Sequence, residues 1–407
     1  MVKEKVFIMQ DIRSLFTCLE GEAKRIFNIV RNNGPLTKNS LLSLTNMKLS
    51  TLNRVIQPLL IEGLIVQSGN EESTGGRKPS LFDIDSKRFF VIGIDISRTY
   101  TYVVLSNLKM KILSYHLFTM DVSCIPEKTV SIITDTINTM ISNINITKED
   151  IIGVGLGVVG PLDRNEGIII NPDNFEAPGW SNVHIKTMLE ERLNLPVITD
   201  NGANCAVLLE SNFGYGKGLN SVAYFNCGIG IRTGVISSGN IIRTINNIED
   251  SFGHMVIDVD GEKCHCGNYG CIECYSSAAG ILRKYCSEIK KGRRSIGMSP
   301  EDIHFTDVCI AAEQGDDLAK EVIINAGIIL GTGLANYINL LNPDLMILSG
   351  PLVKISNLYY DTAVDIAINK SFFDEEHRVR FKRFGFYGDY TICLGAAAMF
   401  TQELLAD

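Results

Sequence analysis

The chain has 407 residues, of which 45% are hydrophobic and 21% charged, as in an ordinary globular protein. This length allows two or three domains, each with its own core. The net charge of −8 argues against a protein that coats nucleic acid along its whole length. No apolar run reaches the roughly 18 residues that a membrane span needs.

The N-terminal stretch MVKEKVFIMQDIR is too polar for a secretory signal peptide. Eight cysteines are scattered along the chain and form no disulfide framework: Cys18, Cys124, Cys205, Cys227, Cys274, Cys286, Cys309 and Cys393. Disulfides are rare in reducing compartments, where such cysteines serve as small core residues. We therefore expect a cytoplasmic protein with no membrane contact.

The charge is distributed unevenly. Residues 1–90 hold 13 Lys and Arg against 9 Asp and Glu, a net charge of +4, while the remainder holds 25 against 37, a net charge of −12. A basic N-terminal part on an acidic body suggests that only the N-terminal part meets a polyanion.

Three helices are predicted in this N-terminal part. An apolar face at i, i+3, i+4, i+7 predicts the first helix around Ala23–Val30, and Thr37 is a candidate N-cap for a short second one. A third helix is predicted from about Lys48 to Glu62. Its expected apolar face is Leu49, Leu52, Ile56, Leu59 and Leu60.

The opposite face of the third helix carries hydrogen-bonding side chains in a row: Ser50, Asn53, Arg54 and Gln57, with Lys48 at the start. Asn and Gln can read adenine bidentately and Arg can read guanine, as a major-groove recognition helix requires. A plain solvated face of a three-helix bundle explains the same residues equally well.

The next stretch favours DNA binding. Leu64–Val66 and Leu81–Ile84 are predicted to be two strands, joined by a polar tip that ends in Arg77 and Lys78. A basic hairpin tip after a helix-turn-helix suits contact with phosphates or with the minor groove. We therefore expect double-stranded DNA as a partner.

The remaining 319 residues alternate between strands and helices. Buried strands are predicted at 89–95, 100–105, 151–158, 195–200, 223–227 and 343–349, and a last strand at 390–393 is followed by a helix at 395–405. Strand-hairpin openings near residues 91–105 and 222–237 suggest two related lobes in an α/β fold.

The stretch Gly253–Glu273 carries a metal-binding pattern. Cys264, Cys266 and Cys271 are spaced C-x-C-x4-C, and His254 lies ten residues before the first cysteine. Three thiolates and an imidazole would close the shell of a tetrahedral Zn²⁺, which makes the predicted ion structural. The alternatives are a reduced, metal-free cysteine cluster and a disulfide. His265 also lies between two of the cysteines, and we expect its side chain to point outward.

The pattern G-H-(x9)-C-x-C-G-x-x-G-C-x-E resembles the zinc signature of the ROK family (repressors, uncharacterised open reading frames and sugar kinases). This resemblance implies a winged helix-turn-helix followed by a two-lobed actin-like ATPase (RNase H-like) fold. It divides the chain into a DNA-binding domain at 1–88, a first lobe at 89–202 completed by the C-terminal helix at 383–407, and a second lobe at 203–382. The second lobe would carry the zinc site and an oligomerisation surface.

The kinase motifs of the family are eroded in this chain. The phosphate turn reads Asp95-Ile96-Ser97-Arg98-Thr99 without its glycines, Cys227 stands in place of a phosphate-binding threonine, and Ser251 replaces a sugar-binding glutamate. The catalytic aspartate aligns with Gly202, which has no side chain to act as a base.

The resemblance also implies sugar-binding residues, namely Asn174, Asn201, His254 and Glu273. Trp180 is equally well explained as a ring that stacks on a sugar and as a core residue. The resulting expectation is a repressor of carbohydrate genes, a homodimer or dimer of dimers, controlled by a sugar effector and without kinase activity. The alternatives are an ATP-dependent sugar kinase with Asp200 as a substitute base, and a repressor controlled by a protein partner.

Overall fold

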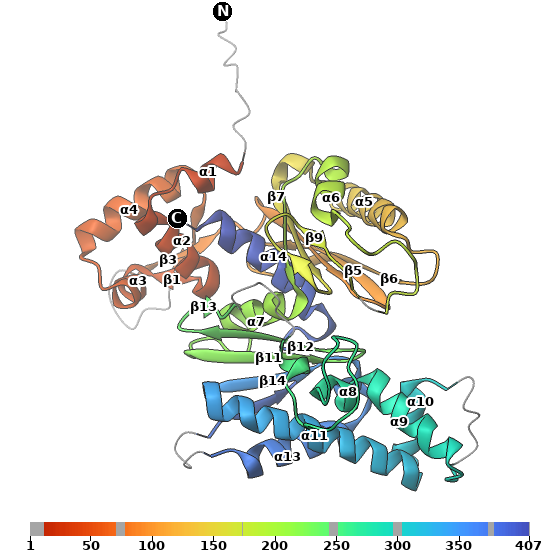
Figure 1. Ribbon diagram of the computed structural model, residues 1–407. Coiled ribbons are helices and arrows are strands. Elements are labelled where there is room, and N and C mark those ends of the chain that lie inside the picture. The colour runs from red at the N-terminus through yellow and green to blue at the C-terminus, as the bar shows by residue number, and fades with distance from the viewer. Residues whose placement is uncertain are drawn as a thin grey trace, which may run out of the picture.

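The computed structural model describes residues 12–70, 78–172, 174–243, 251–295, 303–372 and 378–406. It contains a small N-terminal part, which we call the head (residues 12–88), and two five-stranded sheets with their helices (Figure 1). Two helices, one central and one C-terminal, lie between the sheets (Figure 1).

The head consists of four helices and a three-stranded antiparallel sheet of order β1-β3-β2. Thr37 caps one helix by accepting a hydrogen bond from the Ser40 N–H, and Asn46 ends that helix in the left-handed conformation. The elements are α1 (Ser14–Thr17), α2 (Gly21–Asn33), β1 (Leu36–Thr37), α3 (Lys38–Thr45), α4 (Leu49–Ile61), β2 (Ile65–Asn70) and β3 (Ser80–Ile84).

The three helices expected in the head are confirmed as α2, α3 and α4, with one correction to the apolar face of α4. Leu49 was expected in the core but is 53% exposed, whereas Val55 is buried. Leu49 is the first residue of the helix and precedes its buried face, which begins at Leu52. The buried face of α4 is Leu52, Val55, Ile56 and Leu59.

The first sheet has the order β10-β7-β4-β5-β6, and both of its faces are covered. On β4, alternate residues from Phe90 to Ile96 pack against α5 and α6, while Val91 faces the C-terminal helix α14. The elements are β4 (Phe90–Ile96), β5 (Tyr100–Asn107), β6 (Ile112–Thr119), α5 (Pro126–Asn143), η1 (Lys148–Asp150), β7 (Ile151–Val158), β8 (Leu162–Asp163), β9 (Ile168–Ile169), α6 (Ile185–Leu193), β10 (Val197–Asn201) and α14 (Thr391–Leu404).

The second sheet, β13-β12-β11-β14-β15, repeats this topology: an antiparallel three-stranded meander continues into two parallel strands. Helix α7 covers one face and a group of helices the other (Figure 1). The elements are α7 (Gly202–Phe213), β11 (Ser221–Cys227), β12 (Ile231–Ser237), β13 (Asn240–Ile241), η2 (Ser251–His254), α8 (Ile272–Ser276), α9 (Ala278–Lys290), α10 (Phe305–Glu313), α11 (Asp317–Leu341), β14 (Leu345–Ser349), α12 (Pro351–Ile355), α13 (Asn357–Lys370), β15 (Arg380–Arg383) and η4 (Gly388–Tyr390). The repeat confirms the two related lobes expected from the strand pattern.

Helices α7 and α14 pack against each other between the two sheets. Glycines allow this approach: a Cβ on Gly395 of α14 would lie 2.0 Å from the Cys205 carbonyl oxygen of α7. A Cβ on Gly155 of β7 would lie 1.8 Å from the Ala396 carbonyl oxygen. Any larger residue at either position would have to push the helices apart.

The head packs directly on the body. Phe16 contacts both Phe27 and Phe89, with ring centroids 5.4 and 5.1 Å apart. Arg31 of α2 is buried with its guanidinium 5.4 Å from the Phe213 ring, at the end of α7, and burial lowers its pKa to about 10. Lys109 of the β5–β6 turn pairs with Asp83 of β3 at 2.7 Å.

Helix α11 is long and apolar enough to cross a membrane by length and composition. However, 61% of its most apolar window is buried inside the structure, where it packs against α8, α9, α10 and α13. This burial is typical of the core helix of a globular domain.

Candidate functional site

The outer face of α4 carries a row of polar side chains. Every predicted DNA-contacting residue on it is exposed: Lys48, Ser50, Asn53, Arg54 and Gln57. Lys38, at the start of α3, donates a hydrogen bond of 2.6 Å to the Asn53 side-chain oxygen. Sequence analysis missed Lys38, although its place at the start of the neighbouring helix was a usable signal.

At the hairpin, Lys78 is exposed beside β3. The predicted Arg77 lies outside the described residues. Arg54 lies 3.8 Å from Glu22 of α2, and both side chains are more than half exposed. Such an exposed pair contributes little stability, so Arg54 can turn toward a ligand at small cost.

The structure brings together all four predicted metal ligands. The Nδ1 atom of His254 lies 3.6 Å from the Cys264 sulfur, and the sulfurs of Cys266 and Cys271 lie 3.8 Å apart. All four ligand atoms lie within 4.8 Å of one another. A tetrahedral Zn²⁺ with Zn–S bonds of about 2.3 Å has sulfur–sulfur edges of about 3.8 Å, so these residues fit such an ion.

The local backbone explains this convergence. Short antiparallel bridges join Val256 to Cys271 and Lys263 to Tyr269, which folds the loop back on itself. Gly270 has a φ of +70°, and a Cβ there would lie 1.6 Å from the Asp258 carbonyl oxygen. Glycine is therefore required at the position before Cys271.

The His265 side chain is 46% exposed, as expected, and it also contacts Glu273. Its Nε2 atom lies 2.6 Å from the Oε1 atom of Glu273, because the helix α8 that follows Cys271 turns Glu273 back over the loop. The other oxygen of Glu273 accepts a 2.8 Å hydrogen bond from the Ile231 N–H. Burial alone would raise the pKa of Glu273, but these two hydrogen bonds hold it below its usual value.

Asp200 is buried at the carboxyl end of β10 and carries an ion-pair network. Its carboxylate lies 3.2 Å from Arg164 and 2.6 Å from Arg243. It also accepts hydrogen bonds from the Asn201 N–H at 2.7 Å and the Asn204 side chain at 3.0 Å. Because two arginines and two further donors already bond to its oxygens, the Asp200 carboxylate has no lone pair left to accept a proton from a substrate.

Comparison with known proteins identifies the family. The model of the ROK family matches residues 91–403. The chain belongs to the ROK family. The xylose repressor of Bacillus spizizenii is 30% identical over 334 residues, which cover 81% of this chain and 82% of that repressor.

Two further relatives represent both branches of the ROK family. The glucokinase of Halalkalibacterium halodurans is 34% identical over 227 residues, or 54% of this chain and 68% of that enzyme. The solved structure of a ROK family transcriptional regulator, a homologue of the E. coli MLC protein, has a TM-score of 0.76 at 20% identity and covers 97% of each chain. This match confirms that the α/β architecture is that of the ROK fold.

Gly202 lies beside an apolar side chain and a buried cation. A Cβ on Gly202 would lie 3.1 Å from the Cγ2 atom of Ile392 and 3.7 Å from the NH1 atom of Arg232. Arg232 is 7% exposed, and its Nε and NH1 atoms have no hydrogen-bond partner among the described residues. The space beside Gly202 is therefore bounded by Ile392 and by the Arg232 guanidinium.

Asp95 on β4 and Asp200 on β10 lie on either side of β7 at the same register position, since both pair with Gly157. Its Oδ2 atom is buried and has no hydrogen-bond partner in the described part of the chain. Burial raises the pKa of Asp95 to about 7, although the Arg232 charge and a Tyr100 hydrogen bond oppose the shift.

Two of the predicted sugar-binding residues, Asn201 and Asn174, differ in their exposure to solvent. Asn201 is buried and caps α7 by accepting a hydrogen bond from the Ala203 N–H, whereas Asn174 is exposed, with a φ of +65°. Ser251 lines a pocket of about 310 Å³ together with Thr233 and Arg243.

Trp180 is a core residue. It is 3% exposed, stacks on Phe175 with ring centroids 4.5 Å apart, and donates a hydrogen bond to the Cys124 carbonyl. Of the two explanations left open by the sequence, the structural one is therefore correct.

The Asp200 network predicts a stability effect. Asp200→Asn removes the buried charge that Arg164 and Arg243 share and leaves Arg164 only its exposed partner Glu403, 2.8 Å away, so we expect a loss of about 3 kcal/mol in the free energy of unfolding. Arg243→Gln is the matched control: Arg164 still neutralises Asp200, so the loss should be less than half as large. Urea unfolding measures both. Sugar-dependent ATP turnover that disappears in Asp200→Asn would contradict this structural role.

The raised pKa of Asp95 predicts a pH dependence. An unfolded aspartate has a pKa of about 3.9. Because the folded pKa is raised to about 7, the stability linked to Asp95 is fully present below about pH 4 and is lost as the pH rises to about 7. The stability of Asp95→Asn relative to the wild type should therefore increase between pH 5 and pH 7. Urea unfolding at several pH values checks this, and a difference that stays constant would contradict it.

Proposed function

We propose that this ROK protein is a DNA-binding transcriptional repressor of carbohydrate uptake or catabolism genes. The observation that carries the proposal is the exposed polar row on α4, within a head of four helices and a three-stranded sheet, joined to a ROK body. The similarity to a xylose repressor over most of both chains supports it.

In this proposal the head is a winged helix-turn-helix. Helix α4 enters the major groove, where Asn53, Arg54 and Gln57 read base edges and Lys48 and Ser50 contact the backbone. Arg77 and Lys78 of the hairpin contact phosphates or the minor groove. The protein acts in the cytoplasm as a dimer, because two heads are needed to match the two half-sites of an operator.

The proposed effector is a sugar or sugar derivative held by Asn174, Asn201, His254 and Glu273. The course of α7 supports a coupling between the proposed effector site and the head. This helix begins beside Asn201 and ends at Phe213, whose ring lies against the buried Arg31 of α2. An effector that prefers one arrangement of the two sheets would shift the position of α7 and thereby the spacing of the two heads.

We further propose that the protein has no kinase activity. The base position is Gly202 opposite Arg232, Asp200 is held by two arginines, and Cys227 is buried where a phosphate-binding hydroxyl would be needed. Phosphoryl transfer requires a base and phosphate-binding groups in the correct positions, and the residues at these positions provide neither.

The Cys–His cluster is proposed to hold one structural Zn²⁺. The ion would be ligated by His254, Cys264, Cys266 and Cys271, with no open position for chemistry. When bound it would fix the loop that carries His265 against Glu273, and so fix one wall of the effector site.

DNA binding can be tested by fluorescence anisotropy on DNA from the upstream region of the gene, at physiological salt. Asn53→Ala and Gln57→Ala should each weaken selective binding about tenfold, because each removes a base contact of about 1–3 kcal/mol. Lys48→Ala should weaken binding to all sequences alike and reduce the salt dependence. Asn138→Ala, an exposed asparagine on α5, is the control. Binding without sequence selectivity would contradict the proposal, and selective binding that no sugar relieves would indicate control by another partner.

Zinc can be tested by metal analysis and thermal unfolding. We expect about one Zn²⁺ per chain, and we expect Cys266→Ser to lower both the zinc content and the melting temperature because it opens the ligand shell. Cys18→Ser is the matched control, since Cys18 is also exposed but lies outside the cluster. A protein that is purified without metal, and whose melting temperature does not change in Cys266→Ser, would contradict a structural ion.

A further inference from the structure

The second sheet ends in a strand that is rich in cations. Strand β15 is the outer strand beside β14, and residues 378–388 hold four cations and no acidic residue. Three of these cations, Arg378, Arg380 and Lys382, are exposed, and we call them the basic strip. The strip stands out because residues 91–407 carry a net charge of −12.

Two residues of the basic strip point to the face of the sheet that α7 covers. Arg380 and Lys382 pair with Leu345 and Ile347 of β14, and paired residues of neighbouring strands share a face. Leu345 and Ile347 belong to the cluster that contains the core of α7. Lys382 also reaches the chain just after α7, because its Nζ atom lies 5.1 Å from the centre of the Tyr215 ring.

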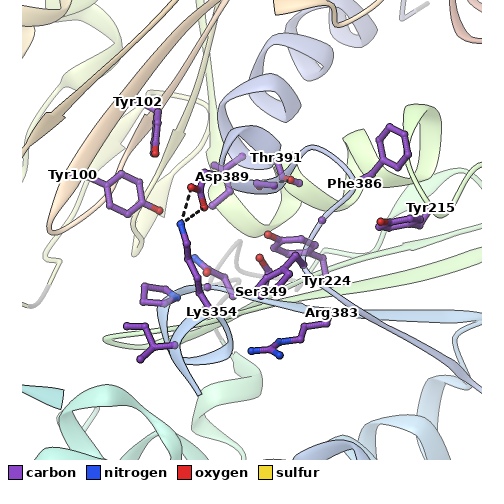
Figure 2. Close-up of a pocket in the computed structure, with 18 of the residues that line it drawn as sticks. Tyr100, Tyr102, Tyr215, Tyr224, Ser349, Lys354, Arg383, Phe386, Asp389 and Thr391 are labelled. Carbon is purple, nitrogen blue, oxygen red and sulfur yellow. Dashed lines mark hydrogen bonds and ion pairs between the residues drawn. The ribbon is translucent and has the colours of Figure 1, made fainter. Parts of the chain in front are cut away.

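This end of α7 is where the body meets the head. Lys217 donates a hydrogen bond of 2.5 Å to the Asn32 carbonyl of α2. Tyr215, two residues earlier, is 41% exposed, and its ring contacts that of Phe386 edge to face at 5.3 Å (Figure 2). Figure 1 shows the head above the end of the second sheet where β11 and β14 begin. The basic strip therefore lies beside the head.

The charges of the basic strip are not neutralised by other described residues. None of its three cations forms a salt bridge within the described part of the chain. Arg380 donates to the main-chain carbonyl of Asp344 at 3.4 Å, and Lys382 contacts the Tyr215 ring. A cation held by a carbonyl or a ring keeps its charge and can still attract an anion. Three acidic residues at 374–376 precede the strip in the sequence and lie outside the described residues.

A duplex bound to α4 would pass close to the basic strip. Helix α2 connects the two places, since Arg54 of α4 lies 3.8 Å from Glu22 near its start and Lys217 bonds to Asn32 near its end. Ten residues of helix separate Glu22 from Asn32, which is about 15 Å. One turn of DNA spans about 34 Å. DNA beside an acidic body is repelled except where cations face it, and the strip provides them.

We propose that the basic strip is a second DNA contact, which binds phosphates of the duplex that flanks the half-site on α4. The inference rests on the DNA binding proposed for the head. Phosphate contacts add affinity that depends on salt and not on sequence. Because the strip belongs to the second sheet, the DNA is held by the head and by the second sheet at once. A shift of that sheet relative to the head therefore weakens binding even where α4 stays in place.

Two duplexes of different length test the second contact by fluorescence anisotropy on the full-length protein. One is the shortest duplex that retains sequence-selective binding, and the other is longer by about one helical turn, ~10 bp, at each end. The wild type should bind the longer duplex about tenfold more tightly at physiological salt, because more phosphates are neutralised. Arg380→Ala/Lys382→Ala should abolish this gain and reduce the salt slope on the longer duplex by about 2. Binding to the short duplex should not change.

Two further variants separate charge from structure. Lys128→Ala/Lys290→Ala removes the same charge from exposed lysines of α5 and α9 and should behave as the wild type. Arg380→Lys/Lys382→Arg keeps both charges of the strip and should retain the gain. A wild type that binds neither duplex selectively would contradict DNA binding by the head, and this inference with it. Selective binding with an unchanged salt slope in Arg380→Ala/Lys382→Ala would leave the role of the head intact and overturn the second contact, as expected if the acidic residues at 374–376 neutralise the strip.

Discussion

The structure depends on the packing of α7 against α14 between the two sheets. Gly395 allows contact with the backbone of α7, and Gly155 allows contact between the first sheet and α14. Neither sheet can move without displacing this pair of helices. The same helices reach the head, since α7 ends at Phe213 under Arg31, and the carbonyl of Ala406, just beyond α14, accepts a hydrogen bond from Lys24. The close packing therefore links the region between the sheets to the DNA-binding surface without a flexible connection.

Buried charge distinguishes the two aspartates at the ends of β4 and β10. The Asp200 carboxylate is surrounded by donors, two of which are arginines. Asp95 has one buried oxygen without a hydrogen-bond partner among the described residues, and burial raises its pKa to about 7. The proposed lack of kinase activity therefore rests on Asp200 and Gly202, and not on Asp95.

The sequence was most informative where a local period or spacing determines the structure. Apolar runs predicted strands β4, β5, β7, β10, β11 and β14, the i, i+3, i+4 pattern predicted helices of the head, and the spacing of the cysteines and His254 predicted which four side chains would meet. The strand predicted at 390–393 was wrong, because these residues form η4 and the start of α14. Contacts between distant segments could not be predicted. Asp200 meets residues 36 and 43 positions away, and His265 meets Glu273 only because α8 turns back over the loop. Leu49 was wrongly predicted to be buried, because an apolar period describes one helix and does not show which of its turns the neighbouring elements cover.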